Sequence, residues 1–171
     1  MNKLVQKGFT LLELMVVISI IGILFTFAAL SISTSSNQDI EEEAKRFVAL
    51  MRLASDEAIM NTQEMVLEVE KNQYHFKILT EKGFVPVDKG DKIFRPRKLP
   101  DNLELKLSIE DQSVNFDDTT DEKLPKIGIY SSGEMTPFEL DFVRDDGLTY
   151  AAKGDFNGTV TYLGKIKDGI N

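Results

Sequence analysis

The stretch "KGFTLLELMVVISIIGIL", residues 7–24, carries one acidic side chain, Glu13, inside a run that is otherwise apolar after Lys7. From Phe9 to Leu30 the chain has 22 residues, and Glu13 is the only charged one among them. A helix of that length can cross a hydrocarbon core of about 30 Å. A carboxylate at the centre of such a helix costs about 2.5–3.5 kcal/mol, so we expect Glu13 to have a partner or a function.

Two ordinary interpretations of this N-terminus remain open. Lys3 and Lys7 before the run, with Ala29-Leu30-Ser31 as a small-x-small site, would suit a secretory signal peptide, but the run is about twice the usual length. A plain membrane anchor would place the basic N-terminus in the cytoplasm and the remainder outside. In that case Glu13 would only complete a helix capping box with Thr10.

The order of residues from Gly8 to Glu13 favours a third interpretation. Glycine, then Phe9 and Thr10, then a glutamate and an unbroken apolar run, resembles the class III signal of type IV pilins and type II secretion pseudopilins. The resemblance implies that a prepilin peptidase and N-methyltransferase cleaves between Gly8 and Phe9 and methylates the new Phe9 amine. It also implies that Glu13 meets the Phe9 ammonium of a neighbouring subunit in a filament.

The same resemblance divides the chain into three parts. A prepilin leader covers residues 1–8, a transmembrane and filament-core helix covers 9–30, and a periplasmic globular domain covers 31–171. Beyond Leu30 there are 27 acidic and 18 basic side chains, a net charge of −9. Such a domain is a poor electrostatic match for nucleic acid or anionic lipid. The absence of cysteine excludes disulfides and thiolate metal sites.

A second helical segment and a series of strands are predicted for the domain, and if the two helical segments join, one helix extends from about Thr10 to Met60. Asp39 and Glu42 fit a capping box, and Asn61 is the expected end of a helix over about 39–61. Its apolar positions have the spacing of one helical face: Ile40, Ala44, Phe47, Val48, Met51, Ala54 and Ala58. Eight short strand patterns follow, which predicts an α+β fold: "MVLEV", "YHFKI", "FVPV", "LELKLSIE", "KIGIY", "FELDFV", "LTYAA" and "TVTYL".

Two further motifs resemble one family. "EEEAKRFVALMRLASDEAIMNTQE" (41–64) and "IYSSGEMTPFEL" (129–140) are similar to the GspH/FimT family, in particular the H-type minor pseudopilin of type II secretion. The resemblance implies a pilin-like fold with a long N-terminal helix packed on two antiparallel β-sheets. It implies a subunit at or near the pseudopilus tip that acts in the export of folded proteins through the outer membrane.

The expected partners and location follow from the same resemblance. The partners are the other minor pseudopilins, the major pseudopilin, the prepilin peptidase and the inner-membrane assembly platform, with secreted cargo or the secretin as further candidates. The protein would be a single-pass inner-membrane protein with a cytoplasmic N-terminus and a periplasmic domain, and would enter the pseudopilus on assembly. The main alternative is a FimT-like minor type IV pilin that takes up DNA, which would require a basic, salt-sensitive surface.

Several polar motifs are expected to be structural rather than catalytic or metal-binding. His75 is the only histidine and is predicted on the surface, with no visible acid to orient it. Ser131, Ser132 and Glu134 are explained by a turn before Pro137. The remaining motifs are predicted as loops or turns: "FRPRKLP" (94–100), "DDTTDE" (117–122) and "GDFNGTV" (154–160). We therefore expect no enzymatic activity, no cofactor and no metal. A membrane-tethered hydrolase is a third hypothesis, but the sequence shows no catalytic constellation for it.

Overall fold

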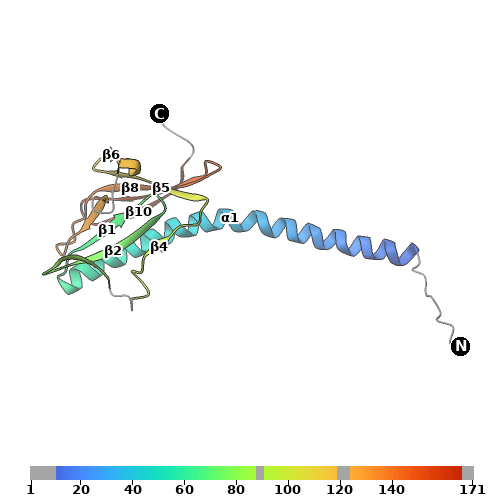
Figure 1. Cartoon of the computed structure of the whole chain (residues 1–171), viewed down its shortest axis with the longest axis horizontal. Coiled ribbons are helices and arrows are strands. Elements are labelled where there is room, and N and C mark those ends of the chain that lie inside the picture. Colours follow the sequence, from blue (N-terminus) through green and yellow to red (C-terminus); the bar gives the residue numbers. More distant parts are fainter. Residues whose placement is uncertain (1–10, 88–90, 119–123, 167–171) are drawn as a thin grey trace. The chain divides into compact units, whose positions relative to one another are not determined.

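The computed structural model describes residues 11–87, 91–118 and 124–166, with the side chains of 23–39 left aside. The chain divides into two compact units, Met1–Asp39 and Ile40–Asn171. The backbone of α1 is helical from Leu11 to Asn61 (Figure 1). The C-terminal part of α1, from Ile40 onward, belongs to the second unit and packs on its sheets.

The end of α1 agrees with the sequence prediction. Every apolar position predicted for the buried face is at most 5% exposed. The helix ends at Asn61, and Thr62 follows it with a positive φ of 50°. The backbone N–H of Gln63 then donates to the carbonyl of Ala58 at 3.0 Å, which satisfies one of the carbonyls left open at a helix end.

The first sheet is antiparallel and has the order β3-β2-β1-β7, with β4 also paired to β2. A tight turn at Lys71–Asn72 joins β1 to β2 and pairs Glu68 with His75. All residues of β1 are buried, on both faces of the strand. The strands are β1 (Met65–Val69), β2 (Gln73–Thr80), β3 (Gly83–Pro86), β4 (Arg97–Lys98) and β7 (Lys126–Ile129).

The second sheet is also antiparallel and has the order β10-β9-β8-β5-β6. In β5 the side chains of Leu103, Leu105 and Leu107 are buried and those between them are exposed, as the alternating pattern predicted. A short 3₁₀ helix, Phe116–Asp118, follows β6. The strands are β5 (Leu103–Ile109), β6 (Gln112–Ser113), β8 (Phe138–Arg144), β9 (Thr149–Gly154) and β10 (Val160–Ile166).

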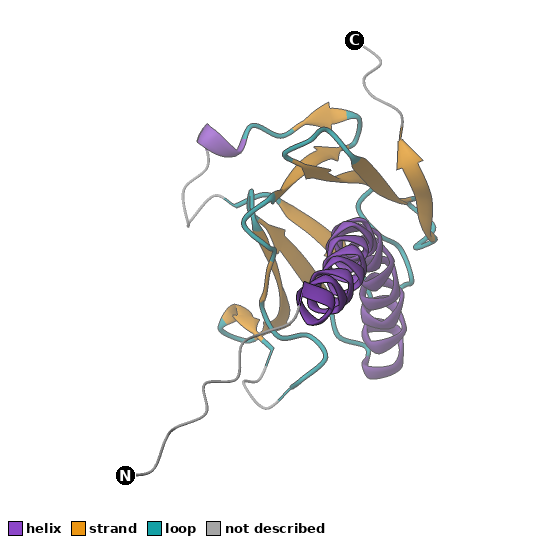
Figure 2. Cartoon of the chain, turned by 90° about the vertical axis from the view of Figure 1, so that its right-hand side faces the viewer, coloured by secondary structure: helices purple, strands orange, loops and turns teal. Residues whose placement is uncertain are grey.

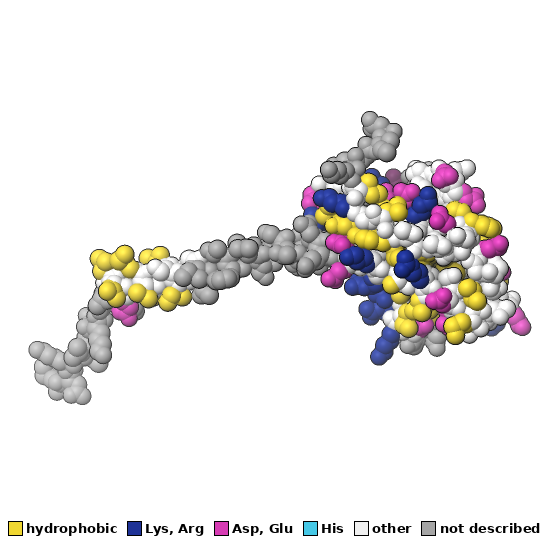
Figure 3. Space-filling view, turned by 180° about the vertical axis from the view of Figure 1, so that it is seen from behind, with side chains coloured by type: hydrophobic (Ala, Val, Ile, Leu, Met, Phe, Trp, Pro, Cys, Tyr) yellow, Lys and Arg dark blue, Asp and Glu magenta, His cyan; other side chains and the backbone are white. Residues whose placement is uncertain are grey.

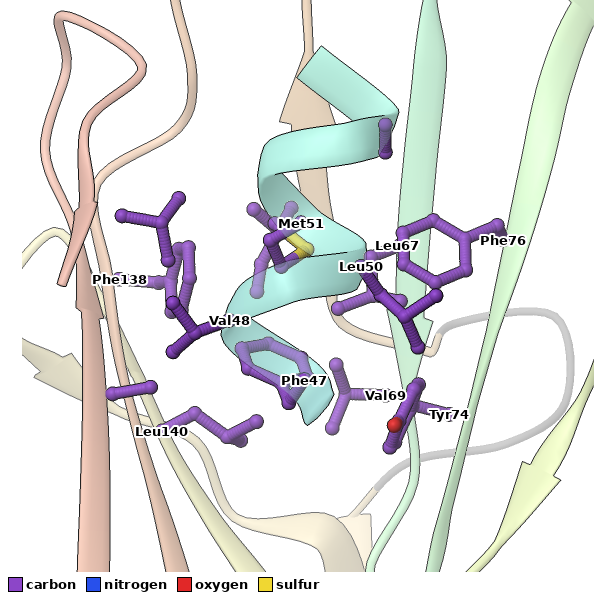
Figure 4. Close-up of a cluster of buried hydrophobic side chains, with 14 of the residues drawn as sticks. Phe47, Val48, Leu50, Met51, Leu67, Val69, Tyr74, Phe76, Phe138 and Leu140 are labelled. Atoms are coloured by element: carbon purple, nitrogen blue, oxygen red, sulfur yellow. The ribbon is translucent and has the colours of Figure 1, made fainter. Parts of the chain in front are cut away.

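The core lies where the C-terminal part of α1 meets both sheets. Figure 2 shows the strands of the two sheets curving around the helix. The ring of Phe47 lies edge-on to Tyr74 of the first sheet at 5.4 Å, and to Phe138 and Phe142 of the second at 5.9 and 5.7 Å (Figure 4). Such aromatic pairs add about 0.5–1.5 kcal/mol each beyond the area they bury. Phe47 therefore joins three layers of the domain through one side chain.

All eight predicted strands are present, and the α+β prediction is confirmed. The structure adds β4 and β6, which are two residues each and too short to produce a periodic pattern. The segment at 94–100 is also better anchored than the predicted solvated loop. Phe94 and Leu99 are only 5% and 3% exposed, and Phe94 packs against Phe76 with the ring centroids 5.1 Å apart.

Candidate functional site

The predicted assembly residues fall on both sides of the boundary of the described structure. Gly8, Phe9 and Thr10 lie outside the described residues, so the cleavage site and the capping box stay predictions. Glu13 lies in the first turn of α1 with an exposed side chain. An acidic side chain at this position is stabilised by the partial positive charge of a helix N-terminus.

The helix around Glu13 exposes apolar side chains on all its faces. Every side chain from Leu11 to Gly22 is exposed. A surface helix of a globular protein normally buries one apolar face, so this segment is suited to an apolar surrounding. The largest exposed fractions are those of Leu11 (77%), Leu12 (73%), Ile18 (66%) and Met15 (63%).

Ser19 is the polar exception in this segment beside Glu13. Its hydroxyl donates to the carbonyl of Met15, four residues earlier, at 2.9 Å. Because the hydrogen bond closes inside the helix, Ser19 can enter an apolar surrounding without an unsatisfied donor.

Within the part of α1 whose side chains are described, no stretch is both long and apolar enough to count as a membrane span.

The motif "SSGEMTPFEL" forms the corner at which the chain passes from the first sheet to the second. Gly133 has a φ of +89°, and its N–H donates to the carbonyl of Tyr130 at 3.0 Å. The hydroxyl of Ser132 donates to the carboxylate of Glu134 at 3.1 Å. The predicted turn is confirmed, and the serine serves that turn.

His75 has an orienting acid, which corrects the sequence interpretation. Its Nε2 lies 2.8 Å from a carboxylate oxygen of Glu68, directly opposite on β1, and its Nδ1 lies 4.0 Å from Glu70. The His75 side chain is only 18% exposed. A two-residue turn at Lys71–Asn72 already places Glu68 opposite His75, so the register of the hairpin could have revealed the pair.

Glu68 is the centre of a charge network on the outer face of the first sheet. Its side chain is 3% exposed, and the ammonium groups of Lys77 and Lys126 lie 2.7 and 3.3 Å from its two oxygens. Burial is the largest single effect and opposes ionisation of this carboxyl, but the hydrogen bonds from Lys77, Lys126 and His75 and the charge of Lys77 together lower its pKa below the ordinary value. With His75, three basic groups therefore hold one buried carboxylate in its charged form.

The two loops "GDFNGTV" and "DDTTDE" are described by the structure to different extents. In "GDFNGTV" the carbonyl oxygen of the Asn157 side chain accepts from the N–H of Thr159 at 3.0 Å, and Gly158 donates to the backbone carbonyl of Asp155 at 3.0 Å. These bonds close a turn, as predicted. In "DDTTDE" only Asp117 and Asp118 are described, in the 3₁₀ helix. Among the described residues, no cluster of acids and histidine has the arrangement of a metal site.

Comparison with known proteins agrees with both motifs quoted from the sequence. Residues 3–29 match the prokaryotic N-terminal methylation motif, and residues 43–159 match the family described as Type II transport protein GspH. Type II secretion system protein H of Pseudomonas aeruginosa is 33% identical over 145 residues, which are 79% of this chain and 81% of that protein. The protein of the same description from Aeromonas hydrophila is 28% identical over 152 residues, 82% of each chain.

Solved structures share the fold. The crystal structure of the minor pseudopilin EpsH of Vibrio cholerae superposes with a TM-score of 0.65 at 23% identity, covering 77% of this chain and 98% of that one. The solution structure of Escherichia coli GspH gives a TM-score of 0.55 at 19% identity and covers 75% and 90% of the two chains.

A methylation motif followed by a helix packed on two antiparallel sheets defines the class of pilin-like proteins. The particular family is shown by the match over residues 43–159: this chain belongs to the GspH family of type II transport proteins. The predicted resemblance is confirmed, and it is confirmed for the H-type pseudopilin rather than for the FimT-like alternative.

Proposed function

We propose that this chain is a minor pseudopilin of the type II secretion system, located at or near the tip of the pseudopilus. The observation that carries the proposal is the segment Leu11–Gly22, which begins within a methylation motif, exposes apolar side chains throughout and holds Glu13 in its first turn. The names of its relatives, Type II secretion system protein H, support the choice of system.

Maturation would create a new cationic group that can pair with Glu13 of a neighbouring subunit. Cleavage between Gly8 and Phe9 leaves an ammonium group at Phe9, which the same enzyme methylates. Residues 9–30 would then span the inner membrane, with residues 31–171 in the periplasm. This topology is supported by Lys3 and Lys7, because basic residues flanking a span stay on the cytoplasmic side.

Glu13 would act by making assembly more favourable than the lone state. A carboxylate costs free energy in a lipid-embedded helix, and pairing with the Phe9 ammonium of the next subunit recovers that cost in an apolar filament core. Removing either charge would leave the other buried without its partner, which is strongly unfavourable. The pair would therefore favour insertion of the subunit in one axial register.

The globular domain would supply contacts rather than catalysis. We expect it to contact the other minor pseudopilins, the major pseudopilin and the assembly platform, and secreted cargo or the secretin as further candidates. The partners found for His75 among the described residues are the carboxylates of Glu68 and Glu70. An imidazole held between carboxylates in a network with two lysines suits a structural role, which supports a protein without enzymatic activity.

Mass spectrometry of the protein extracted from membranes tests the proposed maturation. We expect an N-terminal peptide that begins at Phe9 and carries one additional methyl group. A chain that begins near Ile32 would indicate an ordinary signal peptide, and a chain that begins at Met1 would indicate a plain anchor. Either of these two results would remove the proposed pseudopilin function.

A pair of substitutions at one position tests the role of Glu13. Glu13→Gln has nearly the same shape without the charge, and we expect it to insert and be cleaved but to lose co-purification with the other minor pseudopilins. Glu13→Asp keeps the charge on a shorter side chain and should retain part of that co-purification. Equal recovery of partners with the wild type and with Glu13→Gln would show that the carboxylate does not recruit them.

A further inference from the structure

A basic pocket lies between α1 and the edge strand β4 of an otherwise acidic domain. It is open, has a volume of about 340 Å³, and is lined by Glu43, Arg46, Arg95, Pro96, Arg97 and Lys98. Figure 3 shows Lys and Arg side chains, in dark blue, gathered on one flank of the domain. The sequence motif "FRPRKLP" supplies three of the four cations, and α1 adds Arg46, which lies about 50 residues earlier.

The positive charge of this pocket is only partly balanced. Glu43 forms an ion pair with Arg46, and Lys98 lies 3.6 Å from the exposed carboxylate of Asp101. Among the described residues, no carboxylate pairs with Arg95 or Arg97. The pocket lining therefore has four cations and one anion, although the chain beyond Leu30 as a whole has a net charge of −9.

Two buried donors beside the pocket have no acceptor. The hydroxyl of Tyr74 and the Nε of Arg97 are buried without a hydrogen-bond partner in the described structure. Tyr74 is 0% exposed, and it lies directly opposite Arg97 in the pairing of β2 with β4, so both side chains lie on the same face. A buried donor without an acceptor is unfavourable and is rare in folded proteins.

The Tyr74 hydroxyl belongs to the electrostatic surroundings of the pocket. Burial raises the pKa of Tyr74, the negative charge of Glu43 raises it further, and the positive charges of Arg97 and Arg46 oppose these effects. All three of these charged residues line the pocket. The Nε donor of Arg97 and three further cations therefore line a site that offers one carboxylate as acceptor, already engaged by Arg46, and the buried hydroxyl-bearing Tyr74 lies opposite Arg97 in the strand pairing.

We infer that this pocket binds the phosphate group of a small ligand. A phosphate dianion has several acceptor oxygens and no obligatory donor, which matches guanidinium forks together with a hydroxyl. A volume of about 340 Å³ is sufficient for a phosphate or a lipid headgroup. The acidic remainder of the domain opposes binding only weakly, because its charges are screened over about 8 Å at physiological salt. Free phosphate and a phospholipid headgroup present the same chemistry.

Binding experiments on the full chain in uncharged detergent test the inference and separate the two sources. Inorganic phosphate is titrated by calorimetry in one arm, and phosphatidylglycerol in mixed micelles in the other. The pocket variant is Arg95→Gln/Lys98→Gln. The matched control is Lys82→Gln/Lys92→Gln, which removes the same charge from exposed lysines that do not line the pocket.

We expect at least one ligand to bind, with an affinity about tenfold weaker in the pocket variant and changed less than about twofold in the control. Binding of phosphate alone identifies a free-phosphate site, and binding of phosphatidylglycerol alone identifies a headgroup site. Binding of neither ligand, or equal weakening by both double variants, would overturn the inference.

Tyr74→Phe provides a test that does not disturb the core. In phosphate-free buffer we expect the midpoint of thermal unfolding, followed by circular dichroism, to stay unchanged or to rise, because the lost hydroxyl has no partner. Binding should weaken by about threefold to tenfold if the hydroxyl donates to the ligand. Wild-type affinity in this variant would show that the hydroxyl is not part of the site, and the inference would lose its main support.

Discussion

The two ends of α1 differ in how their apolar side chains are arranged. From Leu11 to Gly22 all side chains are exposed, whereas from Ile40 to Ala58 one face is buried completely against the sheets. The first segment is apolar at nearly every position, whereas the second repeats its buried apolar residues at the spacing of one face and is mostly polar elsewhere. The period of the apolar residues therefore decides which side of the second segment is buried.

The difference also explains which kind of partner each segment requires. A period of 3.6 residues selects one face and can be satisfied by sheets from the same chain. A helix that is apolar on every face has no such direction and is suited to lipid or to a bundle of other subunits. Under the proposed function, α1 would carry one segment that packs within the domain and one segment that packs against lipid or other subunits.

The largest expected effect distinguishes the two segments by loss of apolar volume. Phe47→Ala should lower the free energy of unfolding of the domain by about 4 kcal/mol, because a fully buried ring leaves a cavity between both sheets. Leu14→Ala, at a side chain that is 54% exposed, should change it by less than about 0.5 kcal/mol. Urea unfolding monitored by circular dichroism measures both, and equal effects would break the distinction.

An added charge should instead affect the first segment more than the second, with membrane association as the measured quantity. Ile18→Lys places an ammonium in the apolar segment, where the cost of membrane insertion is about 3 kcal/mol. We expect it to reduce the membrane-bound fraction in carbonate extraction and flotation. Ala49→Lys adds the same charge on the exposed side of the second segment and should leave that fraction unchanged. Comparable loss in both variants would mean that the first segment does not require an apolar surrounding.

The carboxylate inside the domain offers a contrast to Glu13 with an intermediate effect. Glu68→Gln should cost about 2 kcal/mol at pH 7, less than a deeply buried pair, because Lys77 and Lys126 keep contact with solvent. The folded pKa of Glu68 lies below its ordinary value of 4.5, so its stabilisation is present above pH 4.5 and is lost as the pH falls through the folded pKa.

Urea unfolding at several pH values measures this dependence. The stability difference between the wild type and Glu68→Gln should shrink as the pH falls below 4.5. The groups that face Glu68 are His75, Glu70, Lys77 and Lys126, and a Glu70→Gln variant serves as the control at a neighbouring carboxylate. A difference that does not change with pH would show that Glu68 is not charged in the folded protein.

The smallest effect concerns the polar side of the second segment. Two nitrogens of Arg52 donate to the carbonyl of Val160 on β10 at 2.9 and 2.6 Å. Arg52→Met keeps the aliphatic stem and should cost about 1 kcal/mol. Lys45→Met, which breaks an exposed ion pair with Glu41, should cost less than about 0.5 kcal/mol. The urea midpoints of the two variants rank these contributions.

The sequence predicted most of the fold because its strands and helix are periodic. "LELKLSIE" became β5 with its leucines buried, and the helix ended at Asn61. The strands β4 and β6 escaped prediction since two residues cannot show a period and their pairing is decided by partners along β2 and β5. The leader and the assembly residues were predicted from the order of residues alone. Cleavage between Gly8 and Phe9 remains a prediction.

The polar sites were less predictable than the fold for a specific reason. Glu68 lies on the outer face of the first sheet, but it is covered by long lysine side chains, one of them from β7, which lies nearly 60 residues later. The basic pocket likewise requires Arg46 on α1 to meet Arg97 on β4. Contacts between residues so distant in sequence depend on the packing of the layers, and no local pattern encodes them.

The contacts of Phe47 and Arg52 have a mechanical consequence for the domain. Because the Phe47 ring contacts both sheets, a force applied along the C-terminal part of α1 is transmitted to the two sheets together. The two hydrogen bonds from Arg52 to β10 oppose displacement of the same part of the helix. Displacing the C-terminal part of α1 would therefore require contacts with both sheets to break at once.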